Sequence, residues 1–379
     1  MITAVNPKII AWARKRSGLT IEDLAGVMKR DPDELRMWEN GQGAPSYSCL
    51  ESLAYQHFNI PLAIFFFPEP PKIDDPVKKF RRLPDYELER FSPDTFHKIR
   101  LAQAYQDSLI ELLEDTPPKL QIHRDLKPNT SPLSQFALKV RQYLGITIEQ
   151  QFRFKGCDQA FNTWRRAIEN AGIFTFKDSF KDKFVSGFCL FHEEAPIIMV
   201  NNSNAFARQI FTIIHELGHI LLGINGVTDI EESYIEFMDS MEQSLEVKCN
   251  RFTSEVLVPS SAFKPEILLF KKQGIDIVPK LAQKYSVSRE VILRRLLDYG
   301  AIDQEYYGEH SAEWNKDYLR VKQKVSRGNW YLTHLAYVGE GFARLAFEKH
   351  RQGRFDKTAL AGHLNVKARN IDKFRAYLG

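Results

Sequence analysis

Five consecutive residues, His215-Glu216-Leu217-Gly218-His219, constrain this chain more than any other part of its sequence. Side chains four residues apart lie one above the other on a helix, so both imidazoles would project from one face. Two imidazole nitrogens placed in this way can bind one Zn²⁺ ion, and Glu216 would lie beside the metal, where it can take a proton from water. The segment therefore predicts a metal-dependent hydrolase site on a helix, with hydrolysis of a peptide bond as the first hypothesis.

Apolar residues flank the two histidines at helical spacing. They are Phe211, Ile214, Leu217, Ile220 and Leu221. A metal-binding helix should be buried on one side and open to the metal on the other, and this pattern meets that requirement. The alternative is a buried helix with two hydrogen-bonded histidines, and a third ligand from another element would decide between the two interpretations.

A candidate third ligand comes from residues 245–259, which read as a helix that ends at a proline. Glu246 lies at the predicted start of this helix, where taken alone it would be a solvated carboxylate that favours the helix dipole. Next to His215 and His219 it completes the donor set of a catalytic zinc site, with one position left for water. Asn250 follows on the same face and is expected to orient the Glu246 carboxylate. We expect zinc, with Mn²⁺ or Fe²⁺ as alternatives.

The composition limits the classes of protein that the chain can belong to. Its 379 residues suffice for two or three domains, and its contents of 44% hydrophobic and 26% charged residues are typical of soluble globular proteins. The longest apolar run, residues 60–67, is too short to cross a membrane, and no signal peptide is visible. The four scattered cysteines form no Cys-x-x-Cys pair, so we expect free thiols and a cytoplasmic location. The net charge of +4 is too small to indicate nucleic-acid binding by itself.

The first part of the chain, residues 1–72, reads as short helices separated by tight turns. The expected helices span residues 9–16, 18–25, 33–39 and 50–59. Thr20 and Asp23 form a capping-box pattern, and Asp31-Pro32 opens the third helix. Together with the turn Trp38-Glu39-Asn40-Gly41, this order resembles the XRE-type helix-turn-helix of phage-repressor-like proteins, in which the third helix enters the major groove of DNA.

The charges of this module argue against strong DNA binding. Its third helix opens with Asp31, Asp33 and Glu34, and residues 1–72 contain eight Lys and Arg residues against eight Asp and Glu residues, so their net charge is zero. DNA affinity derives largely from the neutralisation of phosphates, which carboxylates on a groove-facing helix oppose. Two interpretations stay open: weak DNA binding, or a helix-turn-helix that docks a protein.

We divide the chain into four parts. Residues 1–72 form the helix-turn-helix domain, residues 73–132 a linker with one long helix, residues 133–300 the metallopeptidase domain, and residues 301–379 a helical region to which no chemistry can be assigned. Residues 115–129 are rich in Pro and polar residues and read as part of the linker.

The predicted fold class is α+β and predominantly α-helical. An all-α helix-turn-helix domain is followed by a zincin-like domain with a small β-sheet and the His-Glu-x-x-His helix, and then by a helical C-terminal region. Three strands are expected before that helix, at residues 172–176, 185–191 and 196–201. Residues 278–297 read as a second helix-turn-helix pair, interpreted as a folding element, and residues 360–372 repeat the same turn pattern.

Residues 160–260 resemble the ImmA/IrrE family of metallopeptidases. The matching segments are residues 197–201, 208–219 and 246–259. The resemblance implies zinc bound by His215, His219 and Glu246, with Glu216 as the base. It also implies a regulatory role, because characterised members of the family cut a transcriptional repressor, and this two-part layout is also similar to components of toxin–antitoxin pairs.

These observations predict a regulatory zinc-dependent endopeptidase, a hydrolase that cuts a protein substrate. The expected substrate is a helix-turn-helix repressor or a co-encoded partner such as a toxin; no membrane partner is expected, and DNA binding would be weak. The alternative is a DNA-binding transcription regulator or antitoxin whose zinc site is structural or vestigial. Glu216 argues against this alternative, because a structural zinc site does not need a base.

Overall fold

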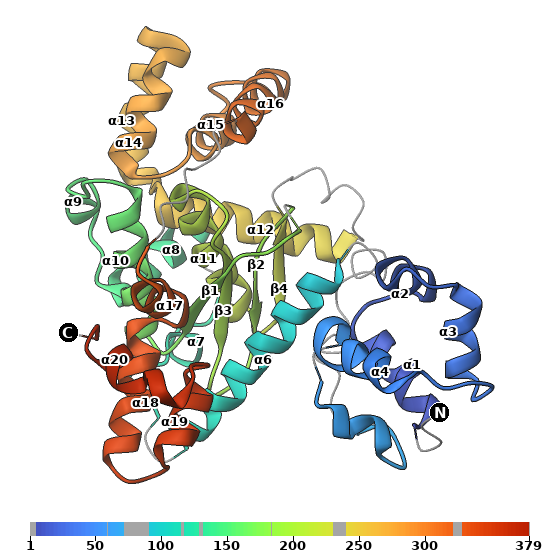
Figure 1. Cartoon of the computed structure of the whole chain (residues 1–379). Helices are drawn as coiled ribbons and strands as arrows, with labels where there is room; N and C mark the ends of the chain where they lie inside the picture. The colour runs from blue at the N-terminus through green and yellow to red at the C-terminus, as the bar shows by residue number, and fades with distance from the viewer. Residues whose placement is uncertain are drawn as a thin grey trace. The chain divides into compact units, whose positions relative to one another are not determined.

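The computed structural model of the chain describes residues 5–58, 60–71, 91–114, 117–128, 132–182, 184–229, 240–320 and 328–378 (Figure 1). The chain divides into two compact units, residues 1–101 and residues 102–379. The predicted fold class is confirmed, because helices predominate, the N-terminal region is helical, and three strands of one small sheet precede the helix that carries His215. The division into four parts stays a prediction. Residues 73–90 of the predicted linker lie outside the described residues.

The first unit is a bundle of short helices. They are α1 (Pro7–Arg16), α2 (Ile21–Met28), α3 (Pro32–Glu39), α4 (Tyr47–Ser52), the π-helix η1 (Leu53–Phe58) and the 3-10 helix η2 (Leu62–Phe66). The capping box of Thr20 and Asp23 is confirmed at the start of α2. The fourth helix begins three residues earlier than predicted because the Ser46 side chain accepts a hydrogen bond from the Cys49 amide.

The second unit contains most of the helices. They are α7 (Ile122–Asp125), α8 (Leu133–Leu144), α9 (Ile148–Gln151), α10 (Cys157–Asn170), α11 (Phe206–Leu221), α12 (Ser240–Leu257), α13 (Ser260–Gln273), η5 (Gly274–Ile277), α14 (Val278–Tyr285), α15 (Arg289–Asp298), α16 (Gln304–Arg320), α17 (Trp330–Val338), α18 (Glu340–Arg351), α19 (Lys357–His363), η6 (Ala368–Asn370) and α20 (Ile371–Arg375). The long helix α6 (Pro93–Leu113) crosses the border between the two units. Helix α7 lies in the stretch that was predicted to be linker. This helix forms because Ile122 is fully buried and its backbone N–H donates a hydrogen bond to the carbonyl of Ala171 at 3.0 Å.

The sheet has four strands in the order β1-β3-β2-β4. They are β1 (Phe174–Asp178), β2 (Val185–Leu190), β3 (Ile197–Asn201) and β4 (Gly226–Asp229). Strand β1 pairs with β3 in parallel, and β2 pairs with both β3 and β4 in antiparallel fashion. The first three strands match the prediction, whereas β4 lies in a segment read as loop. The sequence of β4, Gly-Val-Thr-Asp, is too short to show an alternation of apolar and polar residues. The strand forms because it pairs with β2.

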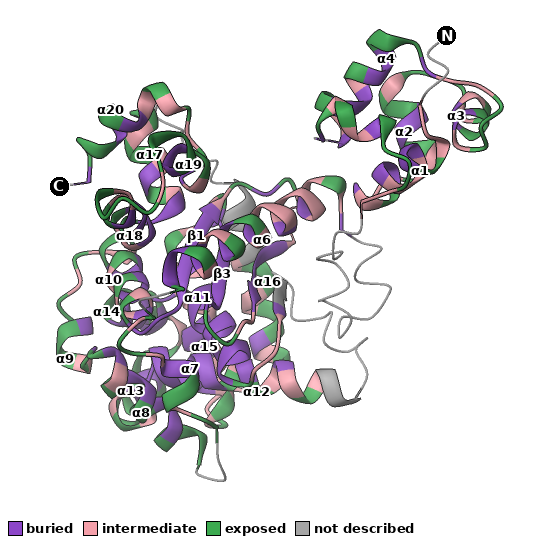
Figure 2. Ribbon diagram, turned by 90° about the horizontal axis from the view of Figure 1, so that it is seen from below, coloured by how far each residue is buried: buried purple, intermediate pink, exposed green. Residues whose placement is uncertain are grey.

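Side chains of the sheet alternate between two helical layers, as the two-residue repeat of a strand requires. The register places Cys189 beside Ile198 on the face that packs against α11. Phe176 lies on the opposite face, where its ring stacks on Tyr105 of α6 with 4.4 Å between ring centroids and meets Phe342 of α18 edge-on at 5.1 Å. The sheet and α11 are therefore buried at the centre of this unit (Figure 2).

Buried polar side chains fix the C-terminal end of α12. Gln151, which is fully buried, donates from Nε2 to the carbonyls of Leu257 at 2.9 Å and Tyr285 at 2.7 Å. Arg141 donates from Nη1 to the Gln151 side-chain oxygen and to the Val256 carbonyl, both at 2.7 Å. The last carbonyls of a helix have no partner within the helix, so these bonds satisfy them and hold α12 in place.

No helix among the described residues is long and apolar enough to cross a membrane. All four cysteines are free; Cys49, Cys189 and Cys249 are buried, and Cys157 is half-buried.

Lys177 is a buried charge on the α11 face of the sheet. It is 7% exposed, and its Nζ lies 4.5 Å from the ring centroid of Phe161 and 5.1 Å from that of Phe206. Burial, with a smaller contribution from the Arg165 charge, lowers the pKa of Lys177 from its ordinary 10.5 to about 7. Between these two values the unfolded chain binds more protons than the folded chain.

The free energy of unfolding should therefore rise with pH from about 7 to about 10.5, because the cost of the buried ammonium disappears across this window. We expect Lys177→Met to raise the melting temperature at neutral pH and to flatten the pH dependence of stability. Thermal unfolding at several pH values checks this, with Lys139→Met, which changes an exposed lysine, as the matched control. An unchanged pH slope in Lys177→Met would contradict the prediction.

Candidate metal centre

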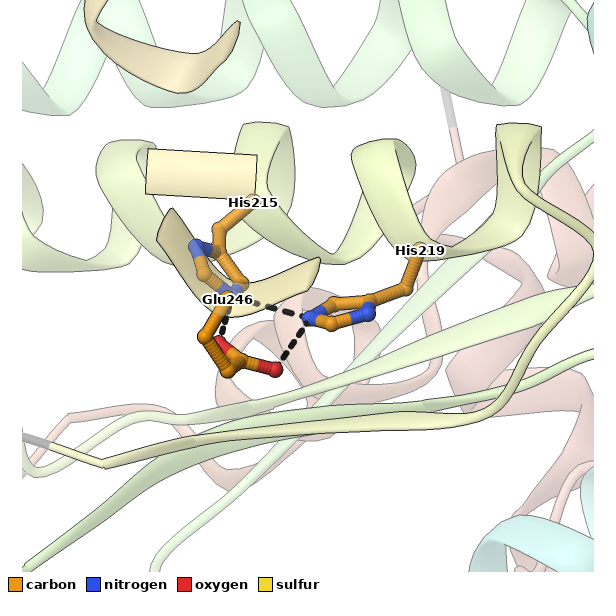
Figure 3. A group of neighbouring side chains, drawn as sticks. All are labelled: His215, His219 and Glu246. Atoms are coloured by element: carbon orange, nitrogen blue, oxygen red, sulfur yellow. Dashed lines mark hydrogen bonds and ion pairs between the residues drawn. The ribbon is translucent and has the colours of Figure 1, made fainter. Parts of the chain in front are cut away.

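Helix α11 carries the His-Glu-x-x-His segment through the interior of the second unit. It packs against β2 and β3 on one side and against α10 and α12 on others, and its residues from Gln209 to Leu221 are all buried. The apolar flanks seen in the sequence therefore pack on the sheet and neighbouring helices, and the two histidines face α12 (Figure 3).

Helix α12 approaches α11 closely at Gly218. A Cβ atom at this position would lie 3.0 Å from Cδ1 of Phe252 and 3.4 Å from Sγ of Cys249, both on α12. Helix α12 begins at Ser240, five residues before the predicted start, so Glu246 lies inside the helix rather than at its start. The close contact at Gly218 allows the Glu246 side chain to reach the two histidines of α11.

The structure brings His215, His219 and Glu246 together (Figure 3). The two Nε2 atoms of the histidines are 2.9 Å apart. Oε2 of Glu246 lies 3.1 Å from Nε2 of His215, and its Oε1 lies 3.1 Å from Nε2 of His219. Two imidazoles and one carboxylate thus direct their donor atoms at one point.

Burial and the charges of neighbouring side chains shift the pKa values of His219 and Glu246 in this cluster. His215 is fully buried, His219 is 2% exposed and Glu246 is 6% exposed. Burial alone would lower the pKa of His219, but the nearby Cys249 and Glu246 side chains outweigh it and raise that pKa. Burial likewise opposes the charge on Glu246, yet the two imidazoles hold the pKa of its carboxyl far below the usual value. Metal binding to such a cluster displaces any proton that its ligands hold.

The cluster fits a divalent cation. Two imidazole nitrogens cannot point their lone pairs at each other across 2.9 Å without a proton or a cation beside them, and the carboxylate adds negative charge at the same point. Within the described chain, Nδ1 of neither histidine has a hydrogen-bond partner, so each ring presents only Nε2 to a neighbour. Imidazole nitrogen and carboxylate oxygen are donors that zinc prefers.

Glu216 and Asn250 occupy different positions relative to the cluster. Glu216 follows His215 on α11, is fully buried, and lies next to the thiol of Cys189. Asn250 lies one turn after Glu246 on α12 and is half-buried, and the hydrogen bonds of the described residues do not join it to the Glu246 carboxylate. The orienting role expected for Asn250 therefore stays a prediction without a supporting contact.

Two neighbours of the cluster have no counterpart in the sequence-based prediction. Gly226 of β4 lies against the His219 ring, since a Cβ atom there would be 2.4 Å from Cδ2 and 2.5 Å from Cγ of that ring. Cys189 of β2 lies beside Glu216, and its Sγ is 3.8 Å from the Ile224 carbonyl. The inward position of Cys189 in its strand could have been found from the two-residue repeat. Nothing in the local sequence distinguishes Gly226 from an ordinary turn glycine.

Two comparisons with known proteins concern this region. The model of peptidase family M78, described as the IrrE N-terminal-like domain, matches residues 168–297, which include α11 and α12. The radiation response metalloprotease IrrE of Deinococcus radiodurans is 31% identical to this chain over 110 residues, which are 28% of this chain and 33% of that protein. The chain thus spans about a third of the length of the curated relative it matches.

The contact between Gly226 and His219 leads to a test of the cluster. Gly226→Ala should displace the His219 ring, because the added methyl group would overlap it, and should weaken zinc binding at least about 10-fold. Competition with a chromophoric chelator measures this affinity. Gly308→Ala is the matched control, since a Cβ atom there meets no atom within 4 Å. Equal zinc affinities of the two variants would contradict the proposed contact.

Proposed function

We propose that this chain is a zinc-dependent endopeptidase with a regulatory role, because residues 168–297 match the model of peptidase family M78 and part of the chain is similar to a metalloprotease. The observation that carries the proposal is the buried cluster of His215, His219 and Glu246, which lies within the matched region and next to Glu216. A structural site would not require this neighbouring carboxylate.

Each residue of the cluster has a role in this proposal. His215, His219 and Glu246 hold the cation, with Mn²⁺ or Fe²⁺ as alternatives to zinc. The bound cation supplies a Lewis acid for the attacking water and for the carbonyl of the scissile bond. Glu216 accepts the proton of the attacking water and later passes it to the leaving amine. All four side chains are buried, so the surrounding protein fixes the directions of their donor atoms.

The position of β4 supports a polypeptide substrate. It is the last strand in the order of the described sheet, and its Gly226 lies against the His219 ring. An edge strand offers unpaired backbone groups to which an extended peptide can add. A peptide bound in this way would run past the cation ligands.

The surface of the N-terminal helix-turn-helix favours a protein partner over DNA. Three of its arginines are paired with its own carboxylates: Arg14 with Glu39 at 2.6 Å, Arg30 with Glu34 at 2.7 Å, and Arg36 with Asp33 at 2.6 Å. Several large apolar side chains are exposed instead. They are Val27, Met37, Tyr47 and Tyr55. We therefore assign to this module the docking of a protein substrate, either a helix-turn-helix repressor or a co-encoded partner.

Glu216→Gln tests the proposed chemistry. We expect it to slow cleavage at least about 100-fold, because the amide cannot accept the proton, and to leave the zinc content at the wild-type level. The assay mixes the zinc-loaded protein with the protein encoded beside it and maps the cut by mass spectrometry. Glu193→Gln, an identical change at an exposed position, is the control.

Each outcome of this assay has a distinct meaning. A discrete cut that a chelator blocks and that Glu216→Gln abolishes supports the endopeptidase. Cleavage by Glu216→Gln at the wild-type rate contradicts the role of Glu216. A stable and uncut complex favours the alternative, a transcription regulator or antitoxin with a structural metal site.

Met37→Glu tests the docking role of the N-terminal module. A buried charge at the docking surface should raise KM for the protein substrate and leave kcat unchanged, because the chemistry occurs in the other unit. Leu268→Glu is the matched control, since Leu268 is 63% exposed on α13 and Met37 is 46% exposed. A short peptide that spans the cut should show the same KM with both variants. An unchanged KM for the protein substrate in Met37→Glu argues against docking at this surface.

A further inference from the structure

Three turns of the chain share one backbone geometry. Each contains a residue with left-handed φ between two helices: Lys29 at 53°, Ser286 at 54° and Asn365 at 52°, and the described residues include no other non-glycine residue with positive φ. In each turn, the backbone N–H of the residue after the left-handed one donates a hydrogen bond to the carbonyl five positions earlier. The distances are 3.0 Å in the first turn, 3.0 Å in the second and 2.9 Å in the third. The chain therefore repeats one helix–turn–helix arrangement in α2–α3, α14–α15 and α19–α20.

The arginines of the first two copies interact with groups of the protein itself. In the first copy the arginines pair with neighbouring carboxylates, as described above. In the second copy Arg295 is buried and bonds Glu255 at 2.7 Å. Arg289 and Arg294 lie over the rings of Trp314 and Tyr307, at 4.7 and 4.8 Å from the ring centroids. Neither copy presents a row of unpaired cations to a ligand.

The third copy differs, because its second helix and the turn before it carry exposed cations. They are Lys367, Arg369, Lys373 and Arg375. Among the described residues none of the four takes part in an ion pair. Asp372, the acidic residue of this helix, is paired with Lys357 of α19 at 2.7 Å. The positive charge of this surface is therefore not neutralised by its own carboxylates.

The charge of the surrounding region has the same sign. Residues 328–378 contain nine Lys and Arg residues and four Asp and Glu residues, a net charge of +5, whereas the whole chain carries +4. A cavity of about 580 Å³ opens beside the turn, where Trp330, Asn365 and Asn370 line it together with Lys367 and Arg369. Side-chain amides and cations around a groove are the groups that most often contact phosphate and sugar.

We propose that this surface, formed by the turn after α19 and by η6 and α20, binds the phosphate backbone of double-stranded DNA. Exposed and unpaired lysine and arginine side chains release counterions when they meet phosphates, which supplies most of the affinity of such contacts. The proposal is independent of the proposed peptidase function, since the surface includes none of the residues of the metal cluster. It places DNA binding in the C-terminal region, whereas in the N-terminal module Arg14, Arg30 and Arg36 are paired with carboxylates.

Fluorescence anisotropy of a labelled duplex of about two helical turns (~20 base pairs) tests the proposal on the full chain. The variant Lys367→Gln/Arg369→Gln/Lys373→Gln removes three exposed cations. We expect it to weaken binding at least about 10-fold and to reduce the slope of log affinity against log salt by about 2 to 3 over a range of about 50 to 200 mM salt. Circular dichroism verifies that the variant keeps its helices.

The control variant Lys264→Gln/Lys271→Gln/Lys272→Gln removes the same charge from exposed positions on α13. It should bind the duplex like the wild type. Equal losses in both variants, or no loss in the first, would overturn the proposal. Tighter binding of single-stranded RNA of the same length, or equal binding of polyglutamate, would also overturn it, because the surface would then not be specific for duplex DNA.

Discussion

The close approach of α11, α12 and β4 is the constraint on which the candidate site depends. Donor atoms from two helices must meet within a few ångströms, so the helix backbones must come closer than large side chains allow. Gly218 permits this between α11 and α12, and Gly226 permits β4 to lie against His219. Buried hydrogen bonds from Gln151 hold the C-terminal end of α12, and the contact of Gly218 with Cys249 and Phe252 holds its middle.

Burial gives the cluster its chemistry as well as its shape. Two imidazoles and a carboxylate removed from water lose hydration energy, so each of the three groups needs a partner of suitable charge. A divalent cation satisfies all three groups at once. The same low-dielectric surroundings that raise the cost of the metal-free state strengthen the interaction of Glu216 with charge that develops beside it.

The sequence was sufficient for features that local chemistry determines, and insufficient for those that depend on packing. The capping box at Thr20 and three of the four strands follow from residue type and period. Strand β4 was missed because pairing with β2 forms it, and helix α7 was missed because the burial of Ile122 orders a stretch rich in Pro and polar residues. The contact of Gly226 with His219 joins strand to helix, and no spacing rule encodes it.

The three helix–turn–helix copies show how one backbone solution serves different surfaces. Each turn contains one residue with left-handed φ, and the side chains of the second helix then decide what each copy can contact. The first copy has paired arginines and exposed apolar residues, which support the protein docking proposed for it, and in the second copy Arg295 is buried and bonds Glu255. The third retains unpaired cations such as Lys367 and Arg369 on its surface. Because the backbone is shared, the fold of each copy does not reveal its partner, and the pairing of its charges is the property that separates the three roles.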